Sequence, residues 1–384
     1  MRIILLLLLT TLSINYKIIA QTPADASATA KTTHLYNNLK TIAAQGFMLG
    51  HQDDQAYGVG WKAQSGRSDV LETAGSYPAV HGWDIGKRLV YDFNIDTVRF
   101  DHMVQWMKDA YRRGGINTIS WHLDNLTTGG DSWDKTSSVK DILPGGSKHL
   151  LFIQELDLLA ILLDNLRVGF SKIPVIFRPW HEHNGGWFWW GKGNCNEEDY
   201  IKLFRFTVEY LRDKKKIHHL LYAFSPDRSQ WILDQSAKQN DFYGYPGDDY
   251  VDIIGIDNYG DVGRVGGPNT REQQAENFAL SLKLITEIAR DKNKVAALTE
   301  TGLESVTETE WFTETLLKPI QEGGTEIEIA WALVWRNYST KHHYAPYSGH
   351  KSVSDFQKFE KNIKTFFEKD LRNPYKRNKA LVKK

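Results

Sequence analysis

The strongest constraint on the fold is a rhythm that runs through the chain of 384 residues. Eight short apolar or β-branched runs recur, each ending in polar or aromatic residues: 46–52, 77–84, 116–123, 174–182, 220–227, 251–259, 294–302 and 328–335. Such runs have the length and composition of buried β-strands. Segments with apolar residues at three- and four-residue spacing lie between several of them and predict amphipathic helices: 104–115, 155–167, 199–213 and 275–291.

This alternation of strands and helices predicts an α/β fold with parallel strands and right-handed crossovers. Eight such units predict a single (β/α)8 TIM barrel, a closed parallel eight-stranded barrel with outer helices. The alternative is an open doubly wound sheet, which usually carries an early glycine-rich phosphate loop, and the sequence has no GxGxxG motif. Because no linker interrupts the pattern, we expect one catalytic domain.

The N-terminus reads as a secretory signal peptide. Arg2 precedes an apolar run from Ile3 to Leu9 that is too short to span a bilayer, and Ala20 is a small residue suited to cleavage. No cysteine lies near that cut, so we expect an exported protein, periplasmic or secreted, without a lipid or membrane anchor. The predicted parts are a signal peptide (1–20), a flexible leader (21–33) and the barrel domain (34–384), which ends in a short, solvated basic tail (376–384).

Charge and composition narrow the partners. The chain has 47 basic and 47 acidic residues, and this balance argues against a nucleic acid partner. Aromatic residues make up 12% of the chain, and flat rings suit the apolar faces of sugars. The only cysteine, Cys195, excludes an intramolecular disulfide and is expected to be inert. We expect a monomer that acts on a carbohydrate.

Polar and aromatic residues gather where the predicted strands end. In a barrel of this kind the functional site lies at the carboxyl ends of the strands. The residues at those ends are His51, Asp53, His81, Trp83, Asp84, His122, Glu182, Asp227, Asp257, Tyr259, Glu300, Trp335 and Arg336. Strands that only packed against one another would have no reason to end in this way, so the sequence predicts a site at this edge.

Glu182 and Glu300 follow the fourth and seventh strands, on opposite arcs of an eight-stranded ring. Their carboxyl groups can face each other across the mouth, as glycoside hydrolysis requires. Glu182 lies among four tryptophans, Trp180, Trp187, Trp189 and Trp190, and apolar surroundings should raise its pKa. Glu300 lies among hydroxyl groups and near Tyr259, which favours a carboxylate. The pattern predicts an acid and a nucleophile.

Other chemistries are less well supported. A zinc-binding HExxH motif fails because Gly185 stands four residues after His181, and His342 and His343 offer no obvious third ligand. No GxSxG nucleophile elbow is present. We therefore predict no metal and no cofactor. His122, Trp335 and Arg336 suit sugar hydroxyls and faces, and Trp133, after the third strand, is a weaker candidate.

Five stretches together resemble glycoside hydrolase family 26, best known for β-mannanases: RPWHEHNGGWFWWG, SWHLDN, IDNY, LTETG and WALVWRN. The resemblance implies that Glu182 is the acid/base and Glu300 the nucleophile. It further implies that Tyr259 positions Glu300 and that the substrate contacts are His122, His181, Trp187, Tyr259, Trp335 and Arg336.

The resemblance predicts a retaining enzyme that cleaves β-1,4-mannosidic bonds in galactomannan, glucomannan or manno-oligosaccharides, either within chains or by releasing mannobiose. The two carboxyl groups should then stand about 5–5.5 Å apart. A hydrolase of mixed-linkage β-glucan or β-xylan on the same fold, and a non-catalytic glycan-binding barrel, are the alternatives.

Overall fold

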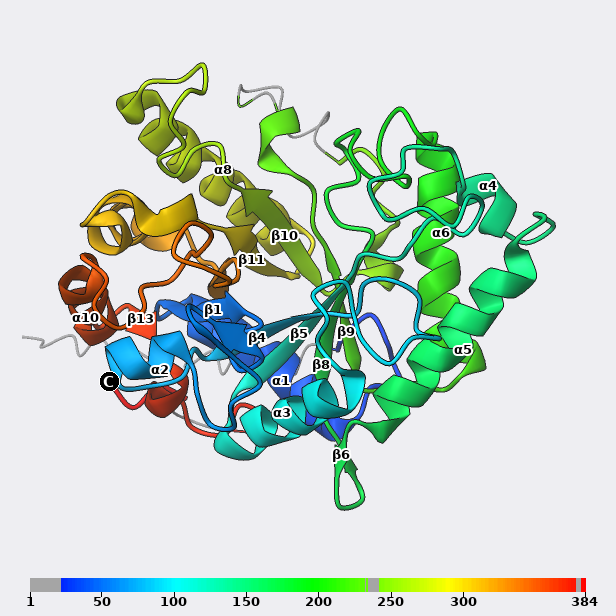
Figure 1. Cartoon of the computed structure of the whole chain (residues 1–384), viewed down its shortest axis with the longest axis horizontal. Coiled ribbons are helices and arrows are strands. Elements are labelled where there is room, and N and C mark those ends of the chain that lie inside the picture. Colours follow the sequence, from blue (N-terminus) through cyan, green and yellow to red (C-terminus); the bar gives the residue numbers. More distant parts are fainter. Residues whose placement is uncertain (1–21, 232, 234–241, 378–380) are drawn as a thin grey trace, which may run out of the picture.

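Eight parallel strands close into a barrel in the computed structural model, which describes residues 22–231, 233, 242–377 and 381–384 (Figure 1). The barrel strands are β1 (Phe47–Gln52), β4 (Val80–Asp84), β5 (Ile116–Trp121), β8 (Val175–Pro179), β9 (Leu220–Phe224), β10 (Ile253–Asn258), β11 (Val295–Thr301) and β12 (Trp331–Val334). They neighbour one another in chain order, and β12 pairs back to β1. Each predicted run contains one of these strands, so the predicted TIM barrel is confirmed.

Helices surround the barrel. The longer ones are α1 (Ala30–Ala43), α3 (Phe100–Arg113), α5 (His149–Asn165), α6 (Glu197–Glu209), α8 (Arg271–Asp291) and α10 (Val353–Lys361); the shorter ones are α2 (Asp69–Ala74), α4 (Val139–Ile142) and α9 (Lys318–Gly323). π-Helical turns follow α6 (Tyr210–Lys214) and precede α9 (Trp311–Leu317). The four predicted helices correspond to α3, α5, α6 and α8. Two small hairpins, β2 (Tyr57–Gly58) with β3 (Trp61–Lys62) and β6 (Arg167–Val168) with β7 (Ser171–Lys172), and the edge strand β13 (Thr365–Phe366) complete the sheets.

Local sequence signals fix where the helices begin and end. Thr270 caps α8, because its hydroxyl accepts a hydrogen bond from the Gln273 backbone while the Gln273 side chain returns to the Thr270 backbone. Gly114 ends α3 at φ 104°, a left-handed conformation that glycine adopts without strain. These signals fix one end of each of two helices that connect consecutive barrel strands, and the parallel pairing of the strands places their carboxyl ends on one face.

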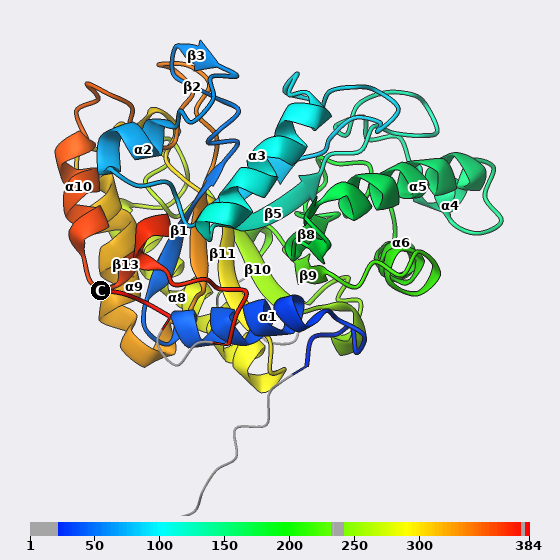
Figure 2. The same ribbon diagram turned by 90° about the horizontal axis from the view of Figure 1, so that it is seen from below.

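The N-terminal end of the barrel is closed by α1 (Figure 2). Leu35, Leu39 and Ile42 of this helix are fully buried and belong to the same apolar cluster as the starts of several barrel strands. Before the helix, the buried carboxyl group of Asp25 pairs with His218 at 2.8 Å. The prediction of a flexible leader at 21–33 is therefore wrong from about Asp25 onward, because long-range contacts hold it. The predicted signal peptide lies outside the described residues.

The C-terminal tail is also packed against the barrel domain. Leu381 is buried, Leu371 and Val382 form an antiparallel bridge, and the Lys384 ammonium group lies 3.1 Å from an Asp370 carboxylate oxygen. The prediction of a solvated tail is therefore wrong for residues 381–384. The buried Leu381 and the ion pair of Lys384 with Asp370 together hold this basic segment against the domain.

A break in register shapes the candidate site. The pairing of β10 with β11 shifts between Ile256 and Asp257, so that Asp257 stands opposite Glu300. Such bulges re-aim side chains and often occur beside active sites. Two acidic residues are thereby placed side by side at the carboxyl end of the barrel.

Candidate active site

The carboxyl group of Glu300, in β11, is held by two donors. Arg178 of β8 donates through Nη2 to Oε2 at 2.5 Å, and the Tyr259 hydroxyl donates to Oε1 at 2.8 Å. Both oxygens of the carboxyl group are thus engaged, one of them by a charge-assisted hydrogen bond from a guanidinium. Burial, and then the charge of Glu300, raise the pKa of Tyr259 well above its ordinary value, which keeps this phenol protonated as a donor.

Arg178 joins Glu300 to Asp257. Its Nη1 donates to Asp257 Oδ2 at 2.7 Å, while the other Asp257 oxygen accepts hydrogen bonds from Ser225 and Thr299, each at 2.8 Å. The Arg178 side chain is 4% exposed, so both of its ion pairs are shielded from water. Burial raises the pKa of Asp257 to about 7, against the opposing influence of Arg178. The guanidinium thus fixes two carboxyl groups.

Glu182 lies in the loop that follows β8. Its backbone is left-handed (φ 52°), as is that of Trp180 (φ 54°), and its N–H donates to the Ser225 carbonyl at 2.7 Å. Non-glycine residues rarely adopt this conformation, and strain of this kind clusters at functional sites. The backbone therefore aims this side chain at the site at an energetic cost that the surrounding contacts offset.

The environment of Glu182 favours its neutral form. Desolvation raises its pKa well above the ordinary value, and the nearby charges of Asp257, Glu300 and Asp227 raise it further. The Trp187 indole N–H donates to Glu182 Oε2 at 2.7 Å and works in the opposite direction. A protonated carboxyl group opposite a carboxylate is the arrangement that an acid and a nucleophile need.

The four tryptophans near Glu182 in the sequence have different surroundings in the structure. Trp180, Trp189 and Trp190 are fully buried, and their N–H groups donate to Thr207 Oγ1, the Leu123 carbonyl and the His181 carbonyl respectively. Among the four, Trp187 makes the direct contact with Glu182 and is partly exposed. Three of the four tryptophans are therefore core residues under the loop, and Trp187 is the one that bonds the Glu182 carboxyl group.

Two histidines and an exposed indole line one side. Asp84 at the end of β4 accepts from His122 Nδ1 at 2.6 Å, and the His122 ring stacks on Trp133 with centroids 5.4 Å apart. Trp133 is 47% exposed and can offer a face to a ligand. The His181 ring meets His122 edge-on at 4.6 Å, and burial, followed by the charge of Arg178, lowers its pKa well below the usual range. His181 is therefore neutral.

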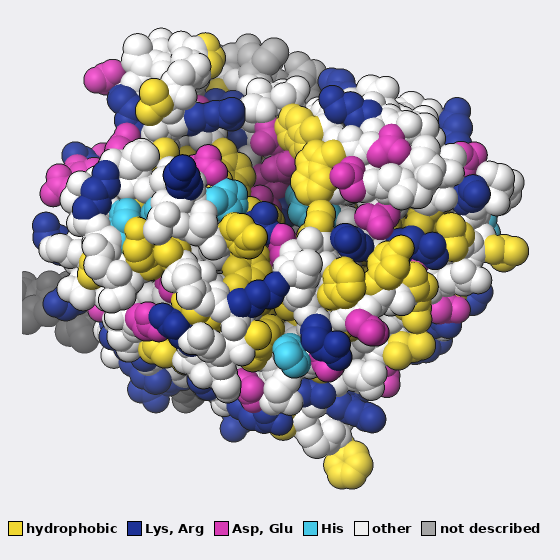
Figure 3. Space-filling view, viewed as in Figure 1, with side chains coloured by type: hydrophobic (Ala, Val, Ile, Leu, Met, Phe, Trp, Pro, Cys, Tyr) yellow, Lys and Arg dark blue, Asp and Glu magenta, His cyan; other side chains and the backbone are white. Residues whose placement is uncertain are grey.

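Trp335 and Arg336, directly after β12, lie on another side of the same mouth. The Trp335 ring is edge-on to His122 at 6.5 Å. Arg336 forms an ion pair with Asp96 and lies 3.5 Å from the Tyr57 hydroxyl. Figure 3 shows a hollow on this face, with acidic side chains at its floor and hydrophobic side chains and histidines at its margins. The structure thus brings the two glutamates and the predicted substrate contacts to one end of the barrel.

Two other strand-end residues have partners elsewhere, because His81 pairs with Asp54 and Glu368 and the buried Trp83 donates to Asn117.

One known protein family matches this chain. The sequence pattern of glycosyl hydrolase family 26 matches residues 24–312, which is more than half of the chain. The chain belongs to glycosyl hydrolase family 26. This confirms the resemblance based on the five motifs, and it agrees with the barrel and with two glutamates close enough for the charge of Glu300 to raise the pKa of Glu182.

Similar proteins include a mannan endo-1,4-beta-mannosidase from Bifidobacterium adolescentis, 32% identical over 365 residues. That alignment covers 88% of this chain and 34% of the relative, so the chain spans about a third of that relative's length. A solved GH26 beta-mannanase from Bacteroides ovatus is 38% identical with a TM-score of 0.84, over 92% of this chain and 99% of that one. A modular endo-beta-1,4-mannanase from Cellulomonas fimi is 32% identical with a TM-score of 0.82, over 94% and 80%.

Sequence reasoning missed Arg178 and gave no role to the contact between Asp84 and His122. The signal for Arg178 was present, since one charged residue interrupts the apolar run VIFRP. A buried charge must be paired. In a barrel strand that ends beside Glu182, the natural partners of such a charge are carboxylates at neighbouring strand ends.

Cys195 is not suited to nucleophilic catalysis. Burial raises the pKa of the Cys195 thiol to about 12, which makes it a poor nucleophile. Within the described ranges, no three His, Cys, Asp or Glu side chains are grouped as a metal site, and no helix is long and apolar enough to cross a membrane.

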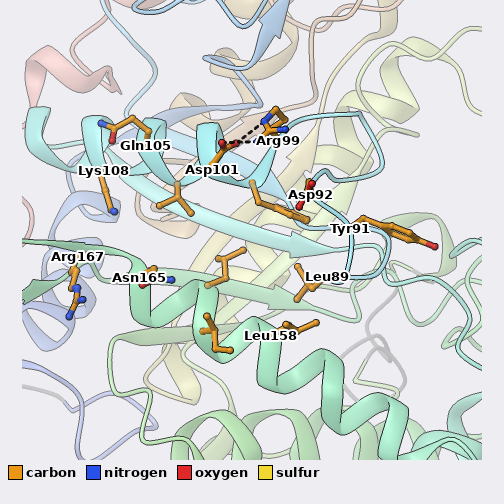
Figure 4. Close-up of a pocket in the computed structure, with 14 residues that line it drawn as sticks. Leu89, Tyr91, Asp92, Arg99, Asp101, Gln105, Lys108, Leu158, Asn165 and Arg167 are labelled. Carbon is orange, nitrogen blue, oxygen red and sulfur yellow. Dashed lines mark hydrogen bonds and ion pairs between the residues drawn. The ribbon is translucent and has the colours of Figure 1, made fainter.

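An open groove of about 630 Å³ lies between α3 and α5 (Figure 4). Its lining includes Tyr91, Gln105, Leu158 and Arg167, and none of the predicted site residues. The groove is therefore separate from the acid pair.

Proposed function

We propose that this protein hydrolyses β-1,4-mannosidic bonds in mannans with retention of configuration. One observation carries the proposal: two carboxyl groups at the mouth of the barrel have opposite electrostatic settings. Glu300 is held by a guanidinium and a phenol, whereas desolvation and neighbouring carboxylates raise the pKa of Glu182. The names of the relatives from Bifidobacterium adolescentis and Bacillus subtilis, mannan endo-1,4-beta-mannosidases, support mannan as the substrate.

In the first step, Glu300 attacks the anomeric carbon while Glu182 donates its proton to the departing glycosidic oxygen. The carbon–oxygen bond breaks, a covalent glycosyl ester forms on Glu300, and Glu182 becomes a carboxylate. Arg178 and Tyr259 hold Glu300 in the attacking orientation through both of its oxygens. Their donors lie in place before the reaction and need no rearrangement.

In the second step, Glu182 takes a proton from water, which attacks the anomeric carbon and releases Glu300. The electrostatic surroundings of Glu182 explain how it changes from an acid to a base. Once Glu300 is esterified it has no negative charge, so one of the influences that raise the pKa of Glu182 disappears. A group that was an acid in the first step is thereby suited to act as a base in the second.

The first experiment is trapping. A 2-deoxy-2-fluoro mannoside with a good leaving group should label Glu300, and peptide mapping should locate the adduct. Glu182→Ala and Glu300→Ala should lose mannan hydrolysis, whereas Glu322→Ala, an exposed glutamate of α9, should not. An initial product of inverted configuration in proton NMR, or full activity of Glu182→Ala, would refute the mechanism.

A second substrate class has one supporting observation. A protein named Endoglucanase H from Acetivibrio thermocellus is 26% identical over 181 residues. Reducing-sugar release from galactomannan, glucomannan, lichenan and xylan separates the two classes. We expect the mannans to be cleaved fastest, and preferential cleavage of lichenan would transfer the proposal to mixed-linkage β-glucan.

We also propose that the protein is exported and acts as a monomer. The sequence signal at residues 1–20 supports export, and fractionation of cells with an antibody to the barrel domain tests it. A time course on mannohexaose separates the two modes of action. Mannobiose alone from the first sample indicates release from chain ends, and mixed lengths indicate cleavage within chains.

A further inference from the structure

Three loops meet around the side chain of Arg336. Its Nη1 pairs with Asp96, in the loop before α3, and lies 3.5 Å from Tyr57 Oη. The Tyr57 hydroxyl in turn donates to Asp53 Oδ2 at 2.8 Å. On the other side, Arg336 Nε lies 3.4 Å from His342 Nε2, in the loop after β12. Among the described residues, Arg336 makes these contacts through Nε and Nη1 and none through Nη2, which leaves Nη2 as a donor for a ligand.

The position of His342 is fixed by the neighbouring loop that follows the Glu300 strand. His342 Nδ1 lies 2.7 Å from Glu304 Oε1, and its ring meets the Tyr344 ring edge-on at 5.4 Å. Ser305 adds two bonds to the same loop, from its N–H to the His343 carbonyl and from its hydroxyl to the Lys341 carbonyl, both at 2.8 Å. These contacts join the loop that follows the candidate nucleophile to the loop that carries His342.

The two contacts of the imidazole define its tautomer. A carboxylate only accepts and a guanidinium only donates. His342 can satisfy both partners only as a neutral ring with its proton on Nδ1, donating to Glu304 and accepting from Arg336 through Nε2. With the proton on Nε2, the N–H groups of His342 and Arg336 would point at each other. The lone pair on Nδ1 would then face the Glu304 carboxylate.

We propose that His342, oriented by Glu304, is a positioning residue that holds the Arg336 guanidinium so that Nη2 faces the bound sugar. This proposal rests on the proposed function and on the substrate contact by Arg336 that the resemblance to family 26 implies. Asp96 anchors one end of the guanidinium, and His342 sets its rotation by accepting from Nε. Binding of the sugar beside Arg336 therefore depends on a side chain that does not touch it.

A matched pair of substitutions tests the role of each ring nitrogen. The amide of asparagine reaches the position of Nδ1, and that of glutamine reaches the position of Nε2. His342→Gln keeps an acceptor for Arg336, whereas His342→Asn keeps only a donor for Glu304. We expect His342→Asn to raise KM for mannotetraose about fivefold, the effect of one lost hydrogen bond, with little change in kcat. His342→Gln should recover most of the wild-type KM.

A double variant tests whether the effect passes through Arg336. Arg336→Ala should raise KM more than His342→Asn, and adding His342→Asn to it should change nothing further. Equal KM values for the Asn and Gln variants, or an additional loss in the Arg336→Ala background, would overturn the proposal. Thermal unfolding of each variant detects general damage to the loop.

The tautomer itself can be read without any substrate. Long-range proton–nitrogen NMR correlations of the His342 ring should show the proton on Nδ1, and a proton on Nε2 would refute the positioning role. If the wild-type protein cleaves no mannan, the proposed function fails, while this measurement still decides the contact between His342 and Arg336.

Discussion

Replacing Arg178 by methionine should damage both stability and catalysis. The side chain makes two charge-assisted hydrogen bonds, to Glu300 at 2.5 Å and to Asp257 at 2.7 Å, and it is almost fully buried. Hydrogen bonds to charged groups contribute about 1.5–3 kcal/mol each, and breaking one partner out of a buried ion pair costs about 3–5 kcal/mol. Because the two bonds share one cation, we expect a loss of about 3–5 kcal/mol in the free energy of unfolding at pH 8.

The loss should depend on pH in a defined direction. Without the guanidinium, nothing offsets the repulsion between the two carboxyl groups, and the pKa of Asp257 in the folded protein rises further. Groups with a raised folded pKa destabilise the fold as pH increases from the unfolded value through the folded one. Asp257 already has a pKa of about 7, so the variant should recover part of its stability at pH 5, where protons replace the missing cation.

Urea unfolding at pH 5 and pH 8 measures this directly. Arg167→Met, at an exposed arginine of the β6–β7 hairpin, serves as the matched control. The free energy of unfolding of Arg178→Lys should lie between the values for Arg178→Met and Arg167→Met, because an ammonium group cannot bond both carboxylates in a fixed fork. The reasoning would be refuted by an Arg178→Met variant within about 0.5 kcal/mol of wild type at pH 8, or by equal losses at the two pH values. In the same variant kcat/KM should fall about 100-fold or more, since the nucleophile loses its orientation.

Three further predictions follow from single contacts. Trp187→Phe removes the N–H that lowers the pKa of Glu182, so the basic limb of the kcat/KM–pH profile should move to higher pH. Tyr259→Phe removes the phenol that donates to the nucleophile, and kcat should fall about 10- to 100-fold with little change in the thermal midpoint. Leu381→Ala should cost about 2–4 kcal/mol in urea unfolding because this leucine is buried, whereas Leu150→Ala, 77% exposed, should cost little.

The barrel could be predicted because its signal is repetitive. Eight apolar runs and four amphipathic segments all require the same architecture, so an error in any one of them does not change the fold. The anchoring of the chain ends could not be predicted in this way. It depends on single long-range pairs, such as Asp25 with His218 and Lys384 with Asp370, which leave no periodic trace in the sequence.

The loop after β8 shows a second limit. Sequence proximity grouped four tryptophans around Glu182, but left-handed residues at 180 and 182 reverse the direction of the side chains. No periodicity of two or 3.6 residues describes such a backbone, so the pattern could not separate Trp187, which bonds Glu182, from Trp180, which is buried in the core. The position of the acid was predictable from the strand end, but its neighbours were not.

The division of roles between the two glutamates is a property of the whole acidic cluster. Glu182, Glu300, Asp257 and Asp227 lie close enough to influence one another, and the Arg178 guanidinium pairs directly with two of them. Four adjacent carboxylates cannot all stay ionised near neutral pH, so the cluster retains protons. Arg178 stabilises the charge on Glu300, while desolvation and the surrounding carboxylates place a proton on Glu182. Replacing a carboxyl group at any of the four positions should therefore shift the pH profile set by the others.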